Sequence, residues 1–237
     1  MSRSSITLVL LSTAFLGSCG GGGYGSAMPP APMNLSSAPG ETAMVSYLQA
    51  SHQYALSEQN SGMYSVQFSS VPGNGTTTFG GMGPAYSIVE TVSVDANGMT
   101  IGGGTTTFYF LLNPYVPLGQ VSSIGTPYGV VTSTNPFPAT LNVGDTGTLD
   151  TETLFHDATM AAVDATLTVS YTVMANDSST LLFCLDSATS AVTAQGTTDG
   201  LSNGSESSCY TVDAAGNVML DSITVTVGGA SIKFVAG

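Results

Sequence analysis

Between residues 167 and 173 the chain reads Leu167-Thr168-Val169-Ser170-Tyr171-Thr172-Val173, so apolar and hydroxyl side chains alternate without a break. Successive side chains of a β-strand point to opposite faces, and this period of two therefore gives the strand one apolar and one polar face. The same alternation returns in residues 64–69 and 223–227. These segments predict an all-β fold of antiparallel strands, arranged as a β-sandwich or an open β-barrel.

Turn-forming residues separate the predicted strands. Three segments rich in Asn, Asp and Gly are expected to form hairpin turns, namely residues 60–62, 95–98 and 213–216. Continuous apolar runs at residues 108–112 and 181–185 predict strands in the middle of a sheet. We expect about ten strands in total.

Two other segments predict something different from strand. Residues 41–50 contain neither Gly nor Pro, and Met44, Tyr47 and Leu48 lie at helical spacing, which predicts one short N-terminal helix. Five prolines lie between residues 113 and 140. Proline cannot donate a backbone hydrogen bond to a sheet, so this region is expected to consist of irregular connections.

The chain of 237 residues is almost free of positive charge. Only 7% of its residues are charged, against about 25% in an average protein. Arg3 and Lys233 are its only basic residues besides histidine, and the formal net charge is −13. Because phosphate groups are bound by clusters of Lys and Arg, the composition argues against a nucleic-acid partner and against a polybasic membrane contact.

The N-terminus has the pattern of an export signal. Arg3 precedes an apolar run at residues 6–16, which is shorter than the roughly twenty residues that span a bilayer. The run ends in Leu16-Gly17-Ser18-Cys19, which resembles the lipobox of bacterial lipoproteins. The resemblance implies a signal peptide over residues 1–18 and a lipid on Cys19. The alternative is an ordinary secretory signal, with Cys19 a bystander or a disulfide partner.

The lipoprotein resemblance also implies an organisation and a location. Residues 19–40 are expected to form a lipidated, Gly- and Pro-rich tether, and residues 41–237 a single β domain. The partner would be a membrane, reached through the N-terminal lipid. Gly20 follows Cys19 where many inner-membrane lipoproteins have Asp, so the expected place is the outer membrane of a Gram-negative cell envelope.

Three cysteines leave one unpaired if two form a disulfide, and lipidation of Cys19 resolves this. Cys184 and Cys209 are then expected to pair in an oxidising compartment, closing a loop of about 25 residues worth roughly 3 to 4 kcal/mol. The alternative, a metal site, would need further ligands at suitable spacing. His52 and His156 each stand alone, so we expect neither a metal nor a cofactor.

Candidate catalytic residues are few. Residues 200–204 match the pattern G-x-S-x-G of serine hydrolases, but the pentad lies in a polar loop and would need His52 or His156 as its base. His156 is followed directly by Asp157. Asp150 and Glu152 would share one face of a strand, which suits a cation or a glycosidase-like pair. We expect instead that they lie on a solvated edge strand.

Beyond residue 40 the chain is similar to uncharacterised lipoproteins of Gram-negative bacteria, through Asn113-Pro114-Tyr115, a strand with Cys184 and a second cysteine before an Asp-x-x-Gly turn. Its closing strands also resemble those of periplasmic lipid carriers. We therefore expect a non-catalytic lipoprotein that binds or supports an envelope component. The alternatives are a carrier of an apolar ligand in a concave sheet face and an envelope hydrolase.

Overall fold

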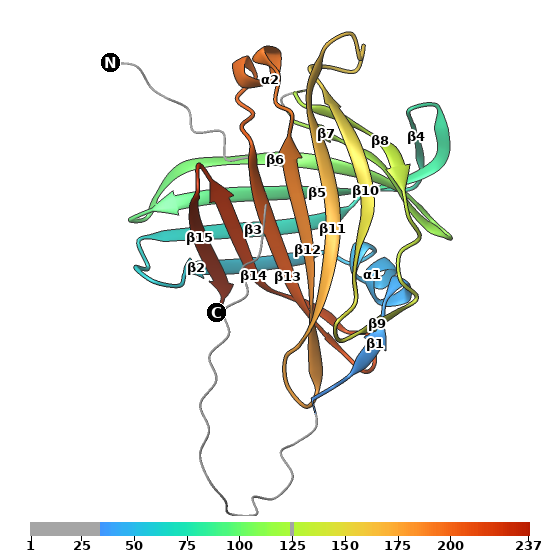
Figure 1. Cartoon of the computed structure of the whole chain (residues 1–237), viewed down its shortest axis with the longest axis vertical. Coiled ribbons are helices and arrows are strands. Elements are labelled where there is room, and N and C mark those ends of the chain that lie inside the picture. The colour runs from blue at the N-terminus through green and yellow to red at the C-terminus, as the bar shows by residue number, and fades with distance from the viewer. Residues whose placement is uncertain (1–33, 124–125) are drawn as a thin grey trace, which may run out of the picture.

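The computed structural model describes residues 34–123 and 126–237, and strands dominate it (Figure 1). The expected signal peptide and Cys19 lie outside the described residues. Within the described part, neither helix is long and apolar enough to cross a membrane.

Fifteen strands and two short helices make up the described chain. They follow one another as β1 (Ser37–Pro39), α1 (Glu41–Leu48), β2 (His52–Glu58), β3 (Tyr64–Pro72), β4 (Thr77–Phe79), β5 (Met82–Ala96), β6 (Met99–Leu112), β7 (Tyr115–Ser122), β8 (Tyr128–Thr134), β9 (Thr140–Asn142), β10 (Thr146–Phe155), β11 (Val163–Ala175), β12 (Thr180–Ser190), α2 (Ala194–Thr198), β13 (Gly204–Asp213), β14 (Val218–Val227) and β15 (Ala230–Ala236).

The strands form a closed antiparallel barrel. Thirteen of them are hydrogen-bonded in the order β3-β2-β15-β14-β13-β12-β11-β10-β8-β7-β6-β5-β4, and β3 also pairs with β5. That pairing closes twelve strands into a ring and leaves β4 outside it. In Figure 1, β10 to β13 run from top to bottom in front of β2, β3, β5 and β6, which run across the view.

The expected all-β antiparallel fold is therefore confirmed. The strands form a closed barrel, whereas the sequence suggested a sandwich or an open barrel. Closure comes from β5, which is 15 residues long and pairs with β3 over residues 88–96. Pairing on both sides removes the exposed strand edges that an open sheet would present to other chains.

Local patterns place the strands as expected. The segment with unbroken alternation, residues 167–173, lies in β11, where Leu167 and Val173 are buried. The predicted hairpin turns join β2 to β3, β5 to β6 and β13 to β14. In the second of these turns Asn97 and Gly98 both have positive φ, at 50° and 78°, the conformation that favours Asn-Gly in two-residue hairpins.

The prediction of irregular connections between residues 113 and 140 is wrong, because β7 and β8 lie there as neighbours in the barrel wall. Of the five prolines, only Pro117 lies within a strand, and it pairs with Phe110 beside a register shift between β6 and β7. The ladder of backbone hydrogen bonds is already interrupted at such a bulge, so the missing N–H of proline removes little pairing. The remaining prolines lie in the connections.

The stretch assigned to a tether joins the fold before it ends. β1 pairs with β9, and Ala38 and Leu141 are buried at this contact. Gly40 then links β1 to α1, and a Cβ at this position would overlap the carbonyl oxygen of Pro138. Residues 37–40 are therefore part of the packed domain.

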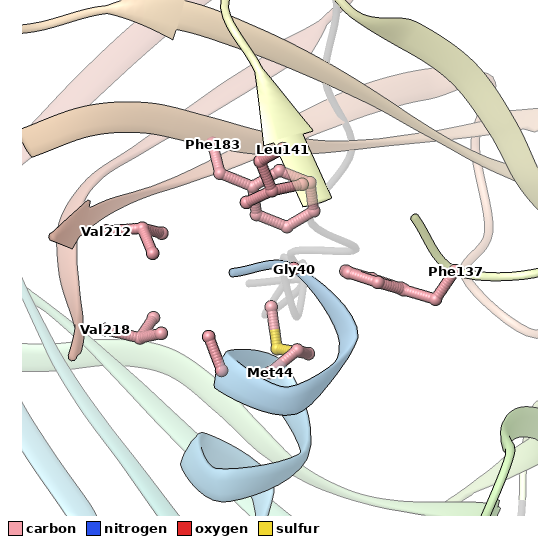
Figure 2. Close-up of a pocket in the computed structure, with 8 residues that line it drawn as sticks. Gly40, Met44, Phe137, Leu141, Phe183, Val212 and Val218 are labelled. Atoms are coloured by element: carbon pink, nitrogen blue, oxygen red, sulfur yellow. The ribbon is translucent and has the colours of Figure 1, made fainter. Parts of the chain in front are cut away.

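Helix α1, which the sequence predicted, seals one end of the barrel. Met44 packs there among Phe137, Leu141, Phe183 and Val212, in a cluster that leaves no room for a water molecule (Figure 2). Glu41 fixes the start of the helix, because its Oε1 accepts a hydrogen bond of 2.7 Å from the backbone nitrogen of Tyr115. The second helix, α2, is a single turn that the sequence did not indicate.

Cys184 and Cys209 face each other across β12 and β13, and their sulfur atoms are 2.07 Å apart, a disulfide distance. The pairing joins two neighbouring strands of the barrel wall.

Candidate ligand-binding cavity

The middle of the barrel contains a cavity of about 410 Å³, which we call the lumen. Its volume lies within the range of about 300 to 1,000 Å³ that is usual for small-molecule sites. The lumen begins at α1, where it is lined by Met44, Tyr47 and Leu48. At the far end of the barrel it reaches Asp199 and Leu201, beside α2.

On β12 the inward-facing side chains become smaller along the strand, and this contributes to the lumen. On β12 the inward positions run from Phe183, at the sealed end, through Leu185 to Ser187 and Thr189. Gly and Thr residues of β6 also line the space. Short side chains cannot reach the opposite wall, so the barrel is filled at one end and hollow in the middle.

The walls are largely aromatic and aliphatic. Six of the aromatic residues that line the lumen are Tyr47, Phe68, Phe108, Phe110, Tyr115 and Tyr210. Such walls remove the apolar part of a small ligand from water, while a few polar groups fix its orientation.

Besides Asp199 at the far end, four carboxyl groups line the same space: Glu90 on β5, Asp150 and Glu152 on β10, and Glu206 on β13. Asp150 and Glu152 are each only 5% exposed. The prediction that these two lie on a solvated edge strand is wrong, because β10 pairs with β8 on one side and β11 on the other. The pairing of β10 with β11 shifts by one residue at Leu149. After this shift the side chains of Asp150 and Glu152 both face the interior of the barrel.

The chain supplies hydrogen bonds to only part of this acidic set. Gln120 Nε2 donates to Glu152 Oε2 at 2.9 Å, and Ser208 Oγ donates to Glu206 Oε1 at 2.6 Å. Asp150 Oδ1 is buried and has no hydrogen-bond partner. Buried polar groups are nearly always paired, so this oxygen is free to accept a hydrogen bond from a group inside the lumen.

The surroundings keep these carboxyls from ionising easily. Burial raises the pKa of Glu90 and Asp150 to about 8, and the neighbouring charges of Glu206 and Glu152 add to the respective shifts. Burial also raises the pKa of Glu152 and Glu206 to about 7, against the lowering effect of their hydrogen bonds. The pKa values of these four carboxyls therefore lie close to neutral pH, where each group can gain or lose a proton.

No basic side chain of the described residues lines the lumen. Lys233 on β15 is the one Lys or Arg in residues 34–237, and it does not belong to the cavity wall. The acidic groups thus have no positive partner within the described barrel.

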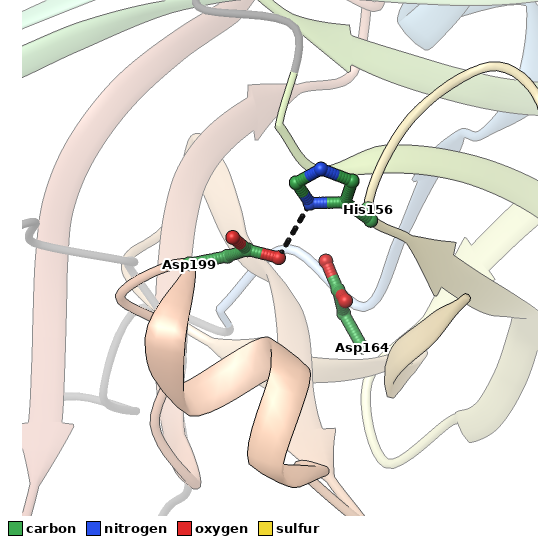
Figure 3. Close-up of side chains that lie close together, drawn as sticks. All are labelled: His156, Asp164 and Asp199. Atoms are coloured by element: carbon green, nitrogen blue, oxygen red, sulfur yellow. Dashed lines mark hydrogen bonds and ion pairs between the residues drawn. The ribbon is translucent and has the colours of Figure 1, made fainter.

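A second polar group lies beside α2, where His156 contacts Asp199 and Asp164 (Figure 3). His156 Nδ1 and Asp199 Oδ2 are 2.8 Å apart, and this hydrogen bond raises the pKa of His156. Asp157, which follows His156 in the sequence, instead accepts hydrogen bonds from Thr159. His156 is thus oriented by a residue 43 positions away.

These three side chains are the one set of His, Cys, Asp and Glu in the described residues whose ligand atoms all lie within 4.8 Å of one another. One nitrogen and two carboxylates could ligate a zinc or manganese ion. Asp164 is fully buried, and neither of its carboxyl oxygens has a hydrogen-bond partner among the described residues. Burial together with the neighbouring charge of Asp199 raises the pKa of Asp164.

The described residues contain no serine bonded to either histidine. His52 Nε2 lies 2.9 Å from the carbonyl oxygen of Tyr47, and the His52 ring stacks on the Tyr47 ring. Ser202, the central residue of the G-x-S-x-G match, is exposed in the loop after α2. The pentad therefore lacks both the preceding strand and the following helix of a nucleophile elbow.

Sequence reasoning missed Glu90, Glu206 and Asp199. A signal existed for Glu90, because the alternating pattern Ile88-x-Glu90-x-Val92 places an acid at a position where apolar residues repeat. Glu206 likewise shares a strand face with Ser208 and Tyr210. An acid in phase with a buried face indicates a carboxyl in the interior.

The chain was compared with protein-family models, with curated proteins and with solved structures, and none of them matches.

Proposed function

We propose that the protein is a non-catalytic lipoprotein of the cell envelope that binds a small, largely apolar molecule in the lumen of its barrel. The observation that carries this proposal is the cavity of about 410 Å³ with mostly apolar walls. Side chains fill the barrel at the end near α1, whereas the middle of the twelve-stranded ring keeps this space open.

The expected lipid on Cys19 supports a carrier role. It would hold the barrel near a membrane, from which apolar molecules enter or into which they leave. A hydrolase is less well supported, since a serine nucleophile needs a base within hydrogen-bond reach and neither histidine provides one in the described residues.

Binding can be tested with N-phenyl-1-naphthylamine, a neutral probe that fluoresces in apolar surroundings. We expect saturable binding of one probe per chain. Ser187→Leu, which extends a side chain into the lumen, should weaken binding by roughly tenfold, because the larger residue takes up the space of the probe. Thr91→Leu is the matched control, since Thr91 is exposed on the outer face of β5.

Two results would contradict the carrier role: no saturable fluorescence with the unaltered chain, or equal binding by the Ser187→Leu and Thr91→Leu variants. The anchor is tested separately by growing cells with an alkyne-tagged fatty acid. Cys19→Ala should abolish labelling of the protein and release it from the membrane fraction, whereas persistent labelling would refute the lipid anchor.

A further inference from the structure

The acidic side of the lumen indicates the charge of its ligand. Besides Asp199 at its far end, four carboxyls line the cavity, and no Lys or Arg among the described residues accompanies them. A buried carboxylate without a partner is strongly disfavoured, so such groups are normally paired with a cation or fully hydrogen-bonded. The chain provides donors for Glu152 and Glu206 but leaves Asp150 Oδ1 without one.

A second polar atom at the wall is also unpaired. Thr189 is only 3% exposed, and its Oγ1 has no hydrogen-bond partner. Like Asp150, it lines the lumen. A hydroxyl accepts as well as donates, so Thr189 suits a donor group such as an ammonium N–H.

We propose that the lumen selects an organic cation, an amine whose ammonium group lies beside Asp150 and Glu152 and whose apolar body lies against the aromatic walls. This inference rests on the proposed binding function and names the chemical class of the ligand. A positive charge there would reduce the repulsion between Asp150 and Glu152 and supply the missing partner of Asp150, while Glu90 and Glu206 add to the negative charge of the lumen. Aromatic faces such as those of Tyr115 and Tyr210 add cation–π attraction.

The arrangement fits an organic cation better than a bare metal ion. A metal requires several ligand atoms around a single point, and the only described group with that proximity is His156, Asp164 and Asp199. The four lumen carboxyls are spread over β5, β10 and β13, around a cavity much larger than an ion. Their arrangement suits a molecule of which only one part is charged.

The test compares three ligands with one chain length and different head groups: decylamine, 1-decanol and decanoate. Binding to the purified full chain is measured by displacement of N-phenyl-1-naphthylamine at pH 8.5, below the concentrations at which the ligands form micelles. We expect decylamine to bind roughly ten- to a hundredfold more tightly than 1-decanol, as for a hydrogen bond to a charged group. Decanoate should bind most weakly, because it brings a negative charge to an acidic wall.

The matched variants remove charge without changing shape. Glu90→Gln combined with Asp150→Asn should reduce the preference for decylamine over 1-decanol by roughly tenfold or more. Asp186→Asn is the control, because Asp186 lies on β12 but outside the lumen, where it accepts hydrogen bonds from Ser207 and Thr172. The control should keep the full preference.

The pH dependence gives an independent readout. The titratable groups that line the lumen are the four carboxyls, Tyr115 beside Asp150, Tyr47 and Tyr210 beside Glu90, and Tyr109, with Asp199 at the far end. Because the carboxyls ionise between about pH 7 and 8, decylamine should bind more tightly at pH 8.5 than at pH 6 and should release protons on binding. Binding of 1-decanol should not strengthen over this interval.

The outcomes separate this inference from the proposed function. If 1-decanol or decanoate binds as tightly as decylamine, or if the double variant keeps the preference, the cation is refuted while the lumen remains a binding site. If neither decylamine nor 1-decanol displaces the probe and the probe itself does not bind, the binding function fails, and the inference fails with it.

Discussion

The two ends of the inward face of β12 differ in one property, the size of their side chains. Phe183 lies at the sealed end, where it packs against Phe137 with ring centroids 5.5 Å apart. Farther along the same face, Ser187 and Thr189 line the lumen. One strand therefore contributes both a packed core and a cavity wall, and on β12 the difference between the two is the size of the inward-facing side chains.

The two regions also differ in the charged side chains that line them. The sealed end is lined by apolar residues, whereas the lumen holds the four carboxyls. Stability and binding are thus expected to depend on different residues of the same strands, and the following changes test that separation.

The largest effect is expected at the sealed end. Phe183 is 1% exposed, and Phe183→Ala should lower the free energy of unfolding by about 3 to 5 kcal/mol, because the truncation leaves a cavity in a packed cluster. Leu185→Ala, two residues along the same face, should cost clearly less because Leu185 already borders open space. Urea unfolding of both variants measures the difference, and equal losses would show that the two regions are packed alike.

The disulfide should stabilise both regions together, since Cys184 and Cys209 join the two strands that pass through them. Replacing both cysteines by Ala is expected to cost roughly 3 to 4 kcal/mol, as estimated for a loop closed over 25 residues. Probe binding at a temperature where the variant is still folded should remain. Two free thiols in the intact mass of the oxidised, unaltered chain would contradict the pairing.

The lumen carboxyls should make the protein less stable as pH rises. A carboxyl whose pKa is higher in the folded than in the unfolded chain binds more protons when folded, so its contribution is present at low pH and is lost as pH rises through the folded value. For Asp150 that value is about 8, against an ordinary 3.8. We expect the free energy of unfolding to fall between pH 5 and pH 9.

Asp150→Asn should flatten this decline by an amount on the order of 1 kcal/mol or more at pH 9. The control, Asp186→Asn, should leave the slope unchanged. Urea unfolding at several pH values measures both, and a stability that rises with pH would show that the lumen carboxyls are ionised in the folded chain already at pH 5.

The smallest effect on stability is expected at Gly129, whose backbone lies beside the carboxylate of Glu152. A Cβ at Gly129 would overlap the carboxylate of Glu152, which a flexible side chain relieves by moving. Gly129→Ala should therefore change stability by about 1 kcal/mol or less but should displace Glu152 from Gln120 and alter the binding of decylamine. Decylamine binding by Gly129→Ala that equals binding by the unaltered chain would exclude a role for this contact.

Much of the fold was predictable because it depends on neighbours in sequence. Alternation located β3, β11 and β14, turn residues located the hairpins, and helical spacing located α1. The face shared by Asp150 and Glu152 was predictable in the same way. The side of the wall on which that face lies was not, because it depends on β8 and β11 covering both edges of β10.

The sequence by itself determined where strands form and which side chains share a face, because a period of two is a property of a few consecutive residues. It also determined that an interior carboxyl would find almost no basic partner, since Lys233 is the only Lys or Arg after residue 3. Only the tertiary structure decided that the sheet closes, which carboxyls meet inside it and that a cavity remains. These outcomes depend on pairings between distant segments, such as residues 56–58 with 234–236, and no local pattern encodes them.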